Sequence, residues 1–439
     1  MLNSKMLGQT DFPHASGQTI ISIDVRETED RWTDMTENTG KCRAGKLLER
    51  ALKLSEEIED ELKKTAAFRN IAVAWTKVDV ERALQVADGI EDESYKTEAL
   101  RDIVSDLAKV DVERAIHVAD GIKDKFLQSS ALCDIAPQLA KVDVERALQL
   151  VDGIGIEIDY EGCKMAALAD IIPQLAKVDV ERALKLAHGI VYSGCKMTAL
   201  CDIASELAKG DVERALEVAG GIEFEGWEVR ALRDIASELA KVDVERALKL
   251  AGGIEHEGCK VQALCDIATR LEQVDLERAK LVFEQAVQVA DGIEDADYKE
   301  GALRQIATDL AKVDLERAKQ MFEQALQVAD LFESGSAKAK ALCNVSADLA
   351  KVDVERAKQV FEQALQATDV IEHEREKAWA LSDIATRLAR VDLERAITIA
   401  DGMNDVYWQA LALTSIARVL LDGEKVQGTT EQGCSIGPC

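Results

Sequence analysis

With 439 residues, the chain is longer than one ordinary hydrophobic core can organise. Its 47% of hydrophobic residues can form a continuous core, which excludes a wholly disordered chain. Acidic residues outnumber basic residues by 82 to 54, and a formal net charge of −28 disfavours binding to nucleic acid or to an anionic membrane surface. This charge either serves solubility or attracts a partner with a basic surface.

The ten cysteines fall mostly inside segments with helical periodicity. No secretory signal pattern opens the chain, and no apolar run reaches the roughly 18 residues that a membrane-spanning helix needs. We therefore expect a cytoplasmic protein with reduced thiols.

Residues 1–44 carry no repeat. Residues 18–25 have the composition of a single strand, and the remainder of this segment is polar. We expect a mobile or loosely docked N-terminal arm.

From residue 45 onward the dominant feature is self-similarity. The tripeptide Glu-Arg-Ala recurs eleven times, at steps of 32, 32, 32, 36, 32, 32, 32, 39, 39 and 39 residues. A period this regular indicates tandem structural repeats. The arginines of the tripeptide are Arg50, Arg82, Arg114, Arg146, Arg182, Arg214, Arg246, Arg278, Arg317, Arg356 and Arg395.

One unit, residues 231–254, shows how each repeat folds. Apolar residues follow the i, i+3, i+4, i+7 rule in both halves, which predicts two amphipathic helices. Asp243 is placed to cap the second helix, with Glu245 in its first turn where the helix dipole favours an anion. We expect Gly252 and Gly253 to end that helix by supplying a left-handed residue.

The step lengths divide the repeats into two groups. Residues 45–274 contain the units of 32 residues and one of 36, whose four extra residues we place in a loop over residues 153–160. Residues 275–422 contain the units of 39 residues and a C-terminal cap. Seven extra residues are close to two helical turns, so they lengthen the second helix without rotating its apolar face. Residues 423–439 are rich in Gly and Thr and read as a flexible tail.

The segment DLERAKQMFEQALQVA, residues 314–329, resembles the second helix of a tetratricopeptide repeat (TPR). Ala318, Phe322 and Ala325 match the small-aromatic-small pattern of that helix, and the Lys209-Gly210-Asp211 turn is similar to the turn of the family. The apolar residues of the first helix also match, although aliphatic side chains replace the usual aromatic ones. They are Leu303, Ile306, Ala307 and Leu310. The 32-residue units depart from the pattern in their shorter second helix.

This resemblance implies an all-α, right-handed superhelix of about eleven helix-turn-helix units, in which the first helix of each unit lines a concave groove. We therefore expect a non-catalytic scaffold that binds a protein or peptide in that groove. A sensor or regulatory subunit that controls a partner enzyme or transcription factor is the alternative.

Two positions on the first helices would point into the groove, and both vary among the units. The most favoured contacts at these positions are Arg69, Arg101, Cys133, Arg233, Arg304, Ser105, Pro137, Pro173, Ser205 and Ser237. The four arginines suit a carboxylate or a backbone carbonyl of the partner. Pro137 and Pro173 fall inside a predicted helix, where we expect kinks that widen the groove.

No catalytic signature is present: the chain lacks a phosphate-loop glycine pattern, GxGxxG, HExxH and GxSxG. We expect no enzyme activity, no cofactor and no metal. Two cysteine series recur at equivalent positions of the units. They form either a metal or redox ladder or small apolar residues at tight contacts. The second interpretation is favoured, because stacked units separate equivalent residues by on the order of 10 Å. The series are Cys163, Cys195 and Cys259, and Cys133, Cys201, Cys265 and Cys343. The pair Cys434 and Cys439 is a weak metal or disulfide candidate.

The recurrent arginine, if half-buried in every unit, needs an acidic partner. An aspartate precedes the core Ile in seven units, and we predict that several of these residues pair with an Arg from the same or an adjacent unit. They are Asp102, Asp134, Asp170, Asp202, Asp234, Asp266 and Asp383.

Overall fold

The structure, a computed structural model, describes residues 40–154 and 161–431. Within these residues the chain forms 22 helices and no strand. The all-α solenoid of TPR-like hairpins expected from the sequence is confirmed. The strand expected over residues 18–25, the loop residues 155–160 and the cysteines Cys434 and Cys439 lie outside the described residues.

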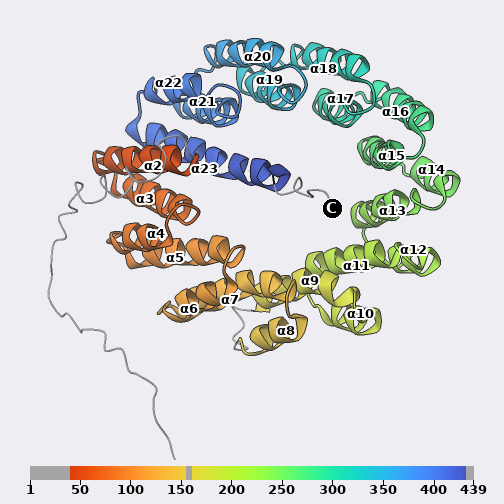
Figure 1. The fold of residues 1–439 in the computed structure, drawn as a ribbon, viewed down its shortest axis with the longest axis horizontal. Coiled ribbons are helices and arrows are strands. Elements are labelled where there is room, and N and C mark those ends of the chain that lie inside the picture. The colour runs from red at the N-terminus through yellow and green to blue at the C-terminus, as the bar shows by residue number, and fades with distance from the viewer. Residues whose placement is uncertain (1–39, 155–160, 432–439) are drawn as a thin grey trace, which may run out of the picture.

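Each unit consists of a first helix and a second helix, which pack as an antiparallel pair (Figure 1). The first helices are α3 (Glu61–Trp75), α5 (Glu93–Ala108), α7 (Lys125–Ala140), α9 (Glu161–Ala176), α11 (Ser193–Leu207), α13 (Glu225–Leu239), α15 (Glu257–Leu271), α17 (Ala296–Leu310), α19 (Gly335–Leu349), α21 (Glu374–Leu388) and α23 (Val406–Glu431). The second helices are α2 (Gly40–Glu56), α4 (Val80–Asp88), α6 (Val112–Asp120), α8 (Val144–Asp152), α10 (Val180–Gly189), α12 (Val212–Gly220), α14 (Val244–Gly252), α16 (Leu276–Asp291), α18 (Leu315–Ala329), α20 (Val354–Thr368) and α22 (Leu393–Asp401).

The second helices other than α2 begin at an aspartate cap, as predicted. The Asp243 carboxylate accepts the backbone N–H of Arg246 at 3.0 Å, and Glu245 lies in the first turn. The same cap is formed by Asp79, Asp111, Asp143, Asp179, Asp211, Asp275, Asp314, Asp353 and Asp392. Each cap satisfies a backbone donor that the helix itself cannot satisfy.

The glycines that end the second helices do not adopt the left-handed conformation that we expected. Gly253 has φ −77° and ψ −11°, which is right-handed helical backbone. A side chain there would instead contact the end of the helix, since a Cβ on Gly253 would lie 3.4 Å from the Leu250 carbonyl oxygen. That distance is an ordinary van der Waals contact, so neither the backbone conformation nor the available space requires glycine there. The apolar residue that follows, Ile254, is buried.

The seven-residue insertions lengthen second helices, as predicted. The helices α16, α18 and α20 contain 15 or 16 residues, whereas α14 and α22 contain nine. The aromatic residues that the insertions supply, Phe283, Phe322 and Phe361, are almost completely buried. The long group therefore comprises three consecutive second helices, and α22 returns to the short form.

The recurrent arginines form a ladder along the second helices, and their predicted partner was wrong. Arg246 binds Glu213 of the preceding second helix at 2.6 Å, not an aspartate of a first helix. Where the second helix is long, the acceptor shifts by seven residues, so that Arg317 binds Glu284 at 2.8 Å. Arg246 keeps 40% of its side-chain surface exposed, whereas Arg82 is buried where it binds Glu49. The reason is that consecutive second helices lie one repeat apart, which brings residues 33 positions apart face to face.

The two ends of the chain meet and close the array into a ring (Figure 1). Helix α2 packs on α23 as the second helix of the unit that α23 begins, so the eleventh hairpin is assembled from both ends of the chain. Helix α23 also packs on α3, as each first helix packs on the next. One continuous cluster of buried side chains includes Leu48 of α2 and Leu413 of α23.

Ion pairs flank this seam between the ends. Lys63 binds Asp405 at 3.1 Å, Lys77 binds Asp422 at 2.7 Å, and Arg50 binds Asp401. Closure of the ring also explains why α2 begins at Gly40. This residue lies within residues 1–44, which we expected to form a non-repeat arm. Cys42, Arg43 and Ala44 stand seven residues before Glu49, Arg50 and Ala51, so α2 matches the long form of the second helix.

The seam can be tested with Leu48, whose side chain is fully buried in α2. Leu48→Ala should lower the free energy of unfolding by about 2–5 kcal/mol, because it removes buried apolar volume and leaves a cavity. It should also speed hydrogen exchange in α23, although α23 lies at the opposite end of the chain. Leu62→Ala, at a side chain of α3 that is 66% exposed, is the control and should change stability by less than about 0.5 kcal/mol. Unchanged exchange in α23 would show that the ends do not pack together.

Variants of two adjacent residues test the contributions of the arginine ladder and of the buried core to stability. Arg246→Ala should cost at most about 1 kcal/mol, because exposed ion pairs contribute little. Ala247→Leu should cost about 1–3 kcal/mol, because Ala247 has no exposed surface and a larger side chain overpacks the contact between helices. Urea unfolding followed by circular dichroism measures both variants, and a reversed order of the two losses would contradict this assignment.

Candidate partner-binding face of the first helices

The first helices form the inner layer of the ring, which Figure 1 shows most clearly where α15, α17, α19 and α21 lie inside α16, α18, α20 and α22. Their solvent-facing side is here called the inner face. It is lined by the residue that precedes the core Ile, or its equivalent, in each first helix. The residues four positions before and four positions after that residue also belong to it. On α5 these residues are Glu98, Asp102 and Asp106, all incompletely buried.

The first of the two predicted contact positions lies against the neighbouring first helix. Its short side chains are buried: Cys133 is 5% exposed and Cys201 is fully buried. Only the long arginine side chains at this position reach beyond the contact between helices. Cys133 is therefore not available to a partner at the surface.

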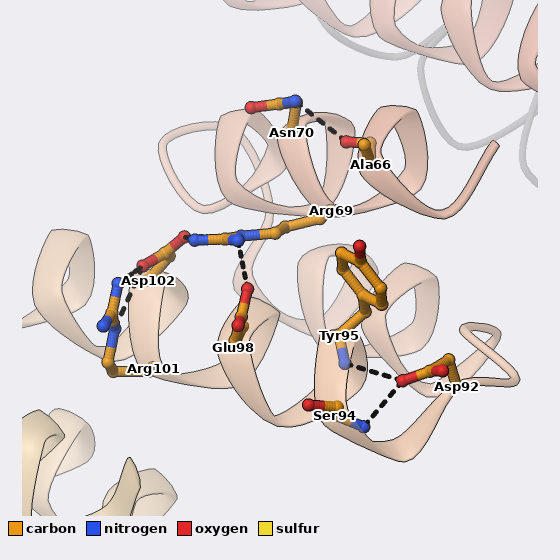
Figure 2. Close-up of polar contacts among 9 residues, drawn as sticks. All are labelled: Ala66, Arg69, Asn70, Asp92, Ser94, Tyr95, Glu98, Arg101 and Asp102. Carbon is orange, nitrogen blue, oxygen red and sulfur yellow. Dashed lines mark hydrogen bonds and ion pairs between the residues drawn. The ribbon is translucent and has the colours of Figure 1, made fainter. Parts of the chain in front are cut away.

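Arg69 and Arg101 belong to one ionic network between α3 and α5 (Figure 2). The Arg69 guanidinium donates to Asp102 at 2.6 and 2.8 Å and also binds Glu98. Arg101 donates to the other oxygen of Asp102 at 2.8 Å. Two arginines therefore share one carboxylate, and the network ties the first two first helices together.

The other two predicted arginines are also paired within the chain. Arg233 donates to Asp234 at 2.7 Å and to Gln262 of the next first helix at 2.9 Å. Arg304 binds Asp348 of the next first helix and lies 3.3 Å from Glu300. Arg69, Arg233 and Arg304 thus join adjacent units, whereas Arg101 pairs with Asp102 of its own helix. A role of these arginines in binding a partner stays a prediction.

The second predicted position is half-buried and keeps some exposed surface. Ser105, Pro137, Pro173, Ser205 and Ser237 all belong to this class. Helices α7 and α9 each continue through their proline. Pro137 and Pro173 have no N–H to donate, so the backbone carbonyls of Cys133 and Ala169 receive no hydrogen bond from that position.

Several aspartates before the core Ile do pair with an arginine of the same or an adjacent unit, as predicted, but with arginines of the first helices. Asp202 binds Arg230 at 2.9 Å, and Asp383 binds Arg387 at 3.1 Å. Asp266 lies 4.0 Å from Arg233. These pairs hold the inner layer together, whereas the recurrent Glu–Arg ladder holds the second helices.

Asp134 and Asp170 differ from the rest, because neither forms an ion pair with any residue that the structure describes. Cys133 and Ala169 stand where Arg101 and Arg233 provide a guanidinium in other units. Both aspartates are exposed, yet burial by neighbouring protein raises the pKa of each carboxyl. The charge of Arg101 opposes this shift in the pKa of Asp134, the charges of Asp102 and Asp170 add to it, and Lys109 opposes it slightly. These two residues were noted in the sequence only as structural pairing partners, and their lack of a partner required the structure.

The same crowding extends along the inner face. Burial raises the pKa of Asp202 and of Asp309, and it raises the pKa of Asp266 to about 6. The nearby charges of Asp309 and Asp234 add to the shift at Asp266, and Arg233 opposes it. Asp348 is the exception, since hydrogen bonds from Lys351 and Arg304 outweigh its burial and lower its pKa. The inner wall from α7 to α15 is therefore acidic and incompletely neutralised.

The cysteines show the environment of packed apolar residues. Burial raises the pKa of Cys133 to about 12 and that of Cys201 to about 11, and it raises the pKa of Cys265 strongly. All eight cysteines within the described residues are free thiols. No group of three or more His, Cys, Asp or Glu residues in that part of the chain could hold a metal ion.

No protein-family model matches the chain, and no curated protein sequence matches it. Ton1535 from Thermococcus onnurineus NA1 is a similar solved structure, with 19% identity over 78% of this chain and 98% of its own, and a TM-score of 0.24. A signal transduction ATPase with numerous domains and a TPR sensor, PH0952 from Pyrococcus horikoshii, is 13% identical over 86% of this chain and 65% of its own, with a TM-score of 0.27. A circular tandem repeat protein is 14% identical over 90% of this chain and 100% of its own, with a TM-score of 0.25. At these identities and TM-scores the similarity carries no functional argument.

The chain is a TPR-like helical repeat protein by its own architecture of stacked hairpins. Among the helices described, none is both long enough and apolar enough to cross a membrane.

The acidic crowding predicts a pH-dependent effect at Asp266. Because the pKa of this carboxyl is about 6 in the folded protein and 3.8 in the unfolded chain, its ionisation opposes folding as the pH rises through this interval. Asp266→Asn should raise the melting temperature at pH 8 and leave it nearly unchanged at pH 4, where the folded carboxyl is already protonated. Asp120→Asn, at an exposed carboxylate outside the inner face, is the control and should show no such pH dependence. Equal shifts at both pH values would contradict the assignment.

Proposed function

We propose that this protein is a non-catalytic scaffold whose inner face binds an extended, basic segment of a partner protein at α7 and α9. The observation that carries the proposal is the pair of unpartnered carboxylates, Asp134 and Asp170, on adjacent first helices. Carboxylates with raised pKa values gain most from a cation, because it removes the cost of holding their charge in a crowded site.

The local chemistry offers acceptors and almost no free donors. Beside each carboxylate stands a backbone carbonyl, of Cys133 or Ala169, whose usual helical donor is replaced by Pro137 or Pro173. The cations whose charges act on Asp134 are paired elsewhere, since Arg101 binds Asp102 and Lys109 binds Asp106. Lys141 and Lys177, which follow α7 and α9, donate to Gln138 and Gln174 at 2.7 and 2.8 Å. A partner that supplies guanidinium or ammonium donors complements such a surface.

The spacing of the units favours an extended ligand. Adjacent first helices pack on the order of 10 Å apart. A polyproline II segment advances about 9 Å every three residues, and the same face recurs at that interval. Basic residues three positions apart would therefore reach Asp134 and Asp170 together.

A binding measurement with synthetic peptides tests the proposal. A peptide with Arg at every third position, separated by Pro-Pro, should bind the wild-type protein, and a peptide of equal composition with its arginines at one end should bind more weakly. The double variant Asp134→Asn, Asp170→Asn should raise the Kd at least tenfold, because each charge-assisted contact contributes about 1–3 kcal/mol. Isothermal titration calorimetry at two salt concentrations measures these values.

The matched control changes the net charge by the same amount elsewhere. Glu91→Gln combined with Asp120→Asn removes two exposed carboxylates from loops and helix ends outside the inner face. This variant should bind the spaced peptide with nearly the wild-type Kd. An equal loss of affinity in both double variants would show that only the overall charge matters, and the proposal would be wrong.

A regulatory or sensor role is the second candidate, and the seam favours it. The eleventh hairpin depends on contact between the two ends of the chain. A ligand that binds the closed ring better than an open array would shift the population between them. Such a shift is the physical requirement for control of a partner.

A further inference from the structure

A pocket of about 590 Å³ lies at the seam, within the size range of small-molecule sites. Lys63 of α3 lines one side, and α21 contributes Arg375 and Leu381. The segment from Gly402 to Asp405 and the first turn of α23 complete the wall, with Tyr407 and Trp408. The pocket therefore joins residues that are more than 300 positions apart in the chain.

The apolar part of the wall suits a hydrocarbon or aromatic body. The rings of Tyr407 and Trp408 meet edge to face with centroids 5.5 Å apart. Leu381 and the buried Met403 add aliphatic surface. Such a wall can bury the apolar surface of a small ligand.

The polar part of the wall suits an anion. Lys63, Arg375 and Lys377 face Glu374 and Asp405, so the lining is net basic in a chain whose net charge is −28. Lys63 is paired with Asp405, and Lys377 lies 3.5 Å from Asp369, but Arg375 forms no ion pair with any described residue. The first turn of α21 carries Glu374 and Glu376, which already offset its helix dipole, so Arg375 is the cation of this helix that can pair with an anion.

Tyr407 is not part of the repeat pattern, whereas the position of Trp408 is also aromatic at Tyr95, Trp227 and Tyr298. Tyr407 stands nine residues before the core Ile416, and Gly162, Gly194, Gly226 and Gly258 occupy that position in four other units. The scaffold thus tolerates glycine there, and the tyrosine is not required for stacking. Burial raises the pKa of Tyr407, against the effect of Lys63 and Arg375, so the phenol is a hydrogen-bond donor at neutral pH.

We propose that the seam pocket binds a small organic carboxylate with an aromatic or aliphatic body, and that the bound ligand holds the ring closed. The carboxylate pairs with Arg375 beside Lys63, and the body packs on Tyr407, Trp408 and Leu381. Among the residues that line this pocket, Lys63 of α3 comes from the N-terminal end of the ring, so opening the ring removes this cation and its contact with the Tyr407 ring from the site. This assignment is independent of the inner-face proposal.

Calorimetry with a defined panel tests the binding step. The probes are phenylacetate, 3-phenylpropionate, indole-3-acetate and hexanoate, each with its primary amide, and inorganic phosphate as an anion without an apolar body. At least one carboxylate should bind the full chain at least tenfold more tightly than its amide and than phosphate. If no carboxylate binds, or if the amides or phosphate bind equally well, the proposal is overturned.

Variants locate the site. Arg375→Ala should weaken the best carboxylate at least tenfold and leave the weaker amide unchanged, whereas Arg390→Ala, an exposed arginine at the other end of α21, should have no effect. Tyr407→Gly, which installs the residue found in four other units, should fold and should weaken both ligands. Full binding by Arg375→Ala would rule out this pocket.

Hydrogen exchange tests the coupling to closure. The best carboxylate should slow exchange in α2 and α23 by at least tenfold, and should leave α13 unchanged as the internal reference. Binding without added protection in α2 and α23 would overturn the proposal that the ligand holds the ring closed.

Discussion

The structure depends on the burial of an apolar face that no single hairpin can bury alone. Each unit presents aliphatic stripes on both of its helices, and neighbouring units cover them by stacking. The alanine of every Glu-Arg-Ala tripeptide is fully buried, which allows the second helix to approach the helices that it packs on closely. An open array would leave one uncovered face at each end. Pairing α2 with α23 covers both faces at once and makes the hydrophobic core continuous across the seam.

Polar interactions fix the alignment of neighbouring units in two separate layers of helices. On the second helices, the Glu–Arg ladder joins residues one repeat apart at a largely exposed surface, where each pair contributes little energy. On the first helices, arginines and aspartates pair in a partly desolvated wall, and the unbalanced carboxylates there shift the pKa values of their neighbours. The ladder repeats with the units, whereas the inner wall varies from unit to unit. The candidate functional residues therefore lie on the inner wall and at the seam, where residues depart from the repeat.

The resemblance to TPR proteins predicts partner contacts on the concave face, and the structure shows which charges on that face are already paired. Arg69, Arg101, Arg233 and Arg304 are long cations whose charges are already paired with carboxylates of their own or a neighbouring first helix. Asp134 and Asp170 form no ion pair with a described residue, whereas Asp202 and Asp383, which also lack a preceding Arg, bind Arg230 and Arg387. The absence of any suitably placed arginine thus leaves two carboxylates as candidate contacts for a partner.

The sequence by itself determined what depends on short range. The 3.6-residue periodicity gave the helices, the aspartates gave their caps, and the seven-residue insertions gave the longer second helices. The tertiary structure alone decided the partner of each charge, because a side chain such as Arg246 selects among acids by the packing of helices one repeat apart. It also decided the closure of the ring. Closure follows from small rotations between units that add up over the whole array, and no local pattern in the sequence records that sum.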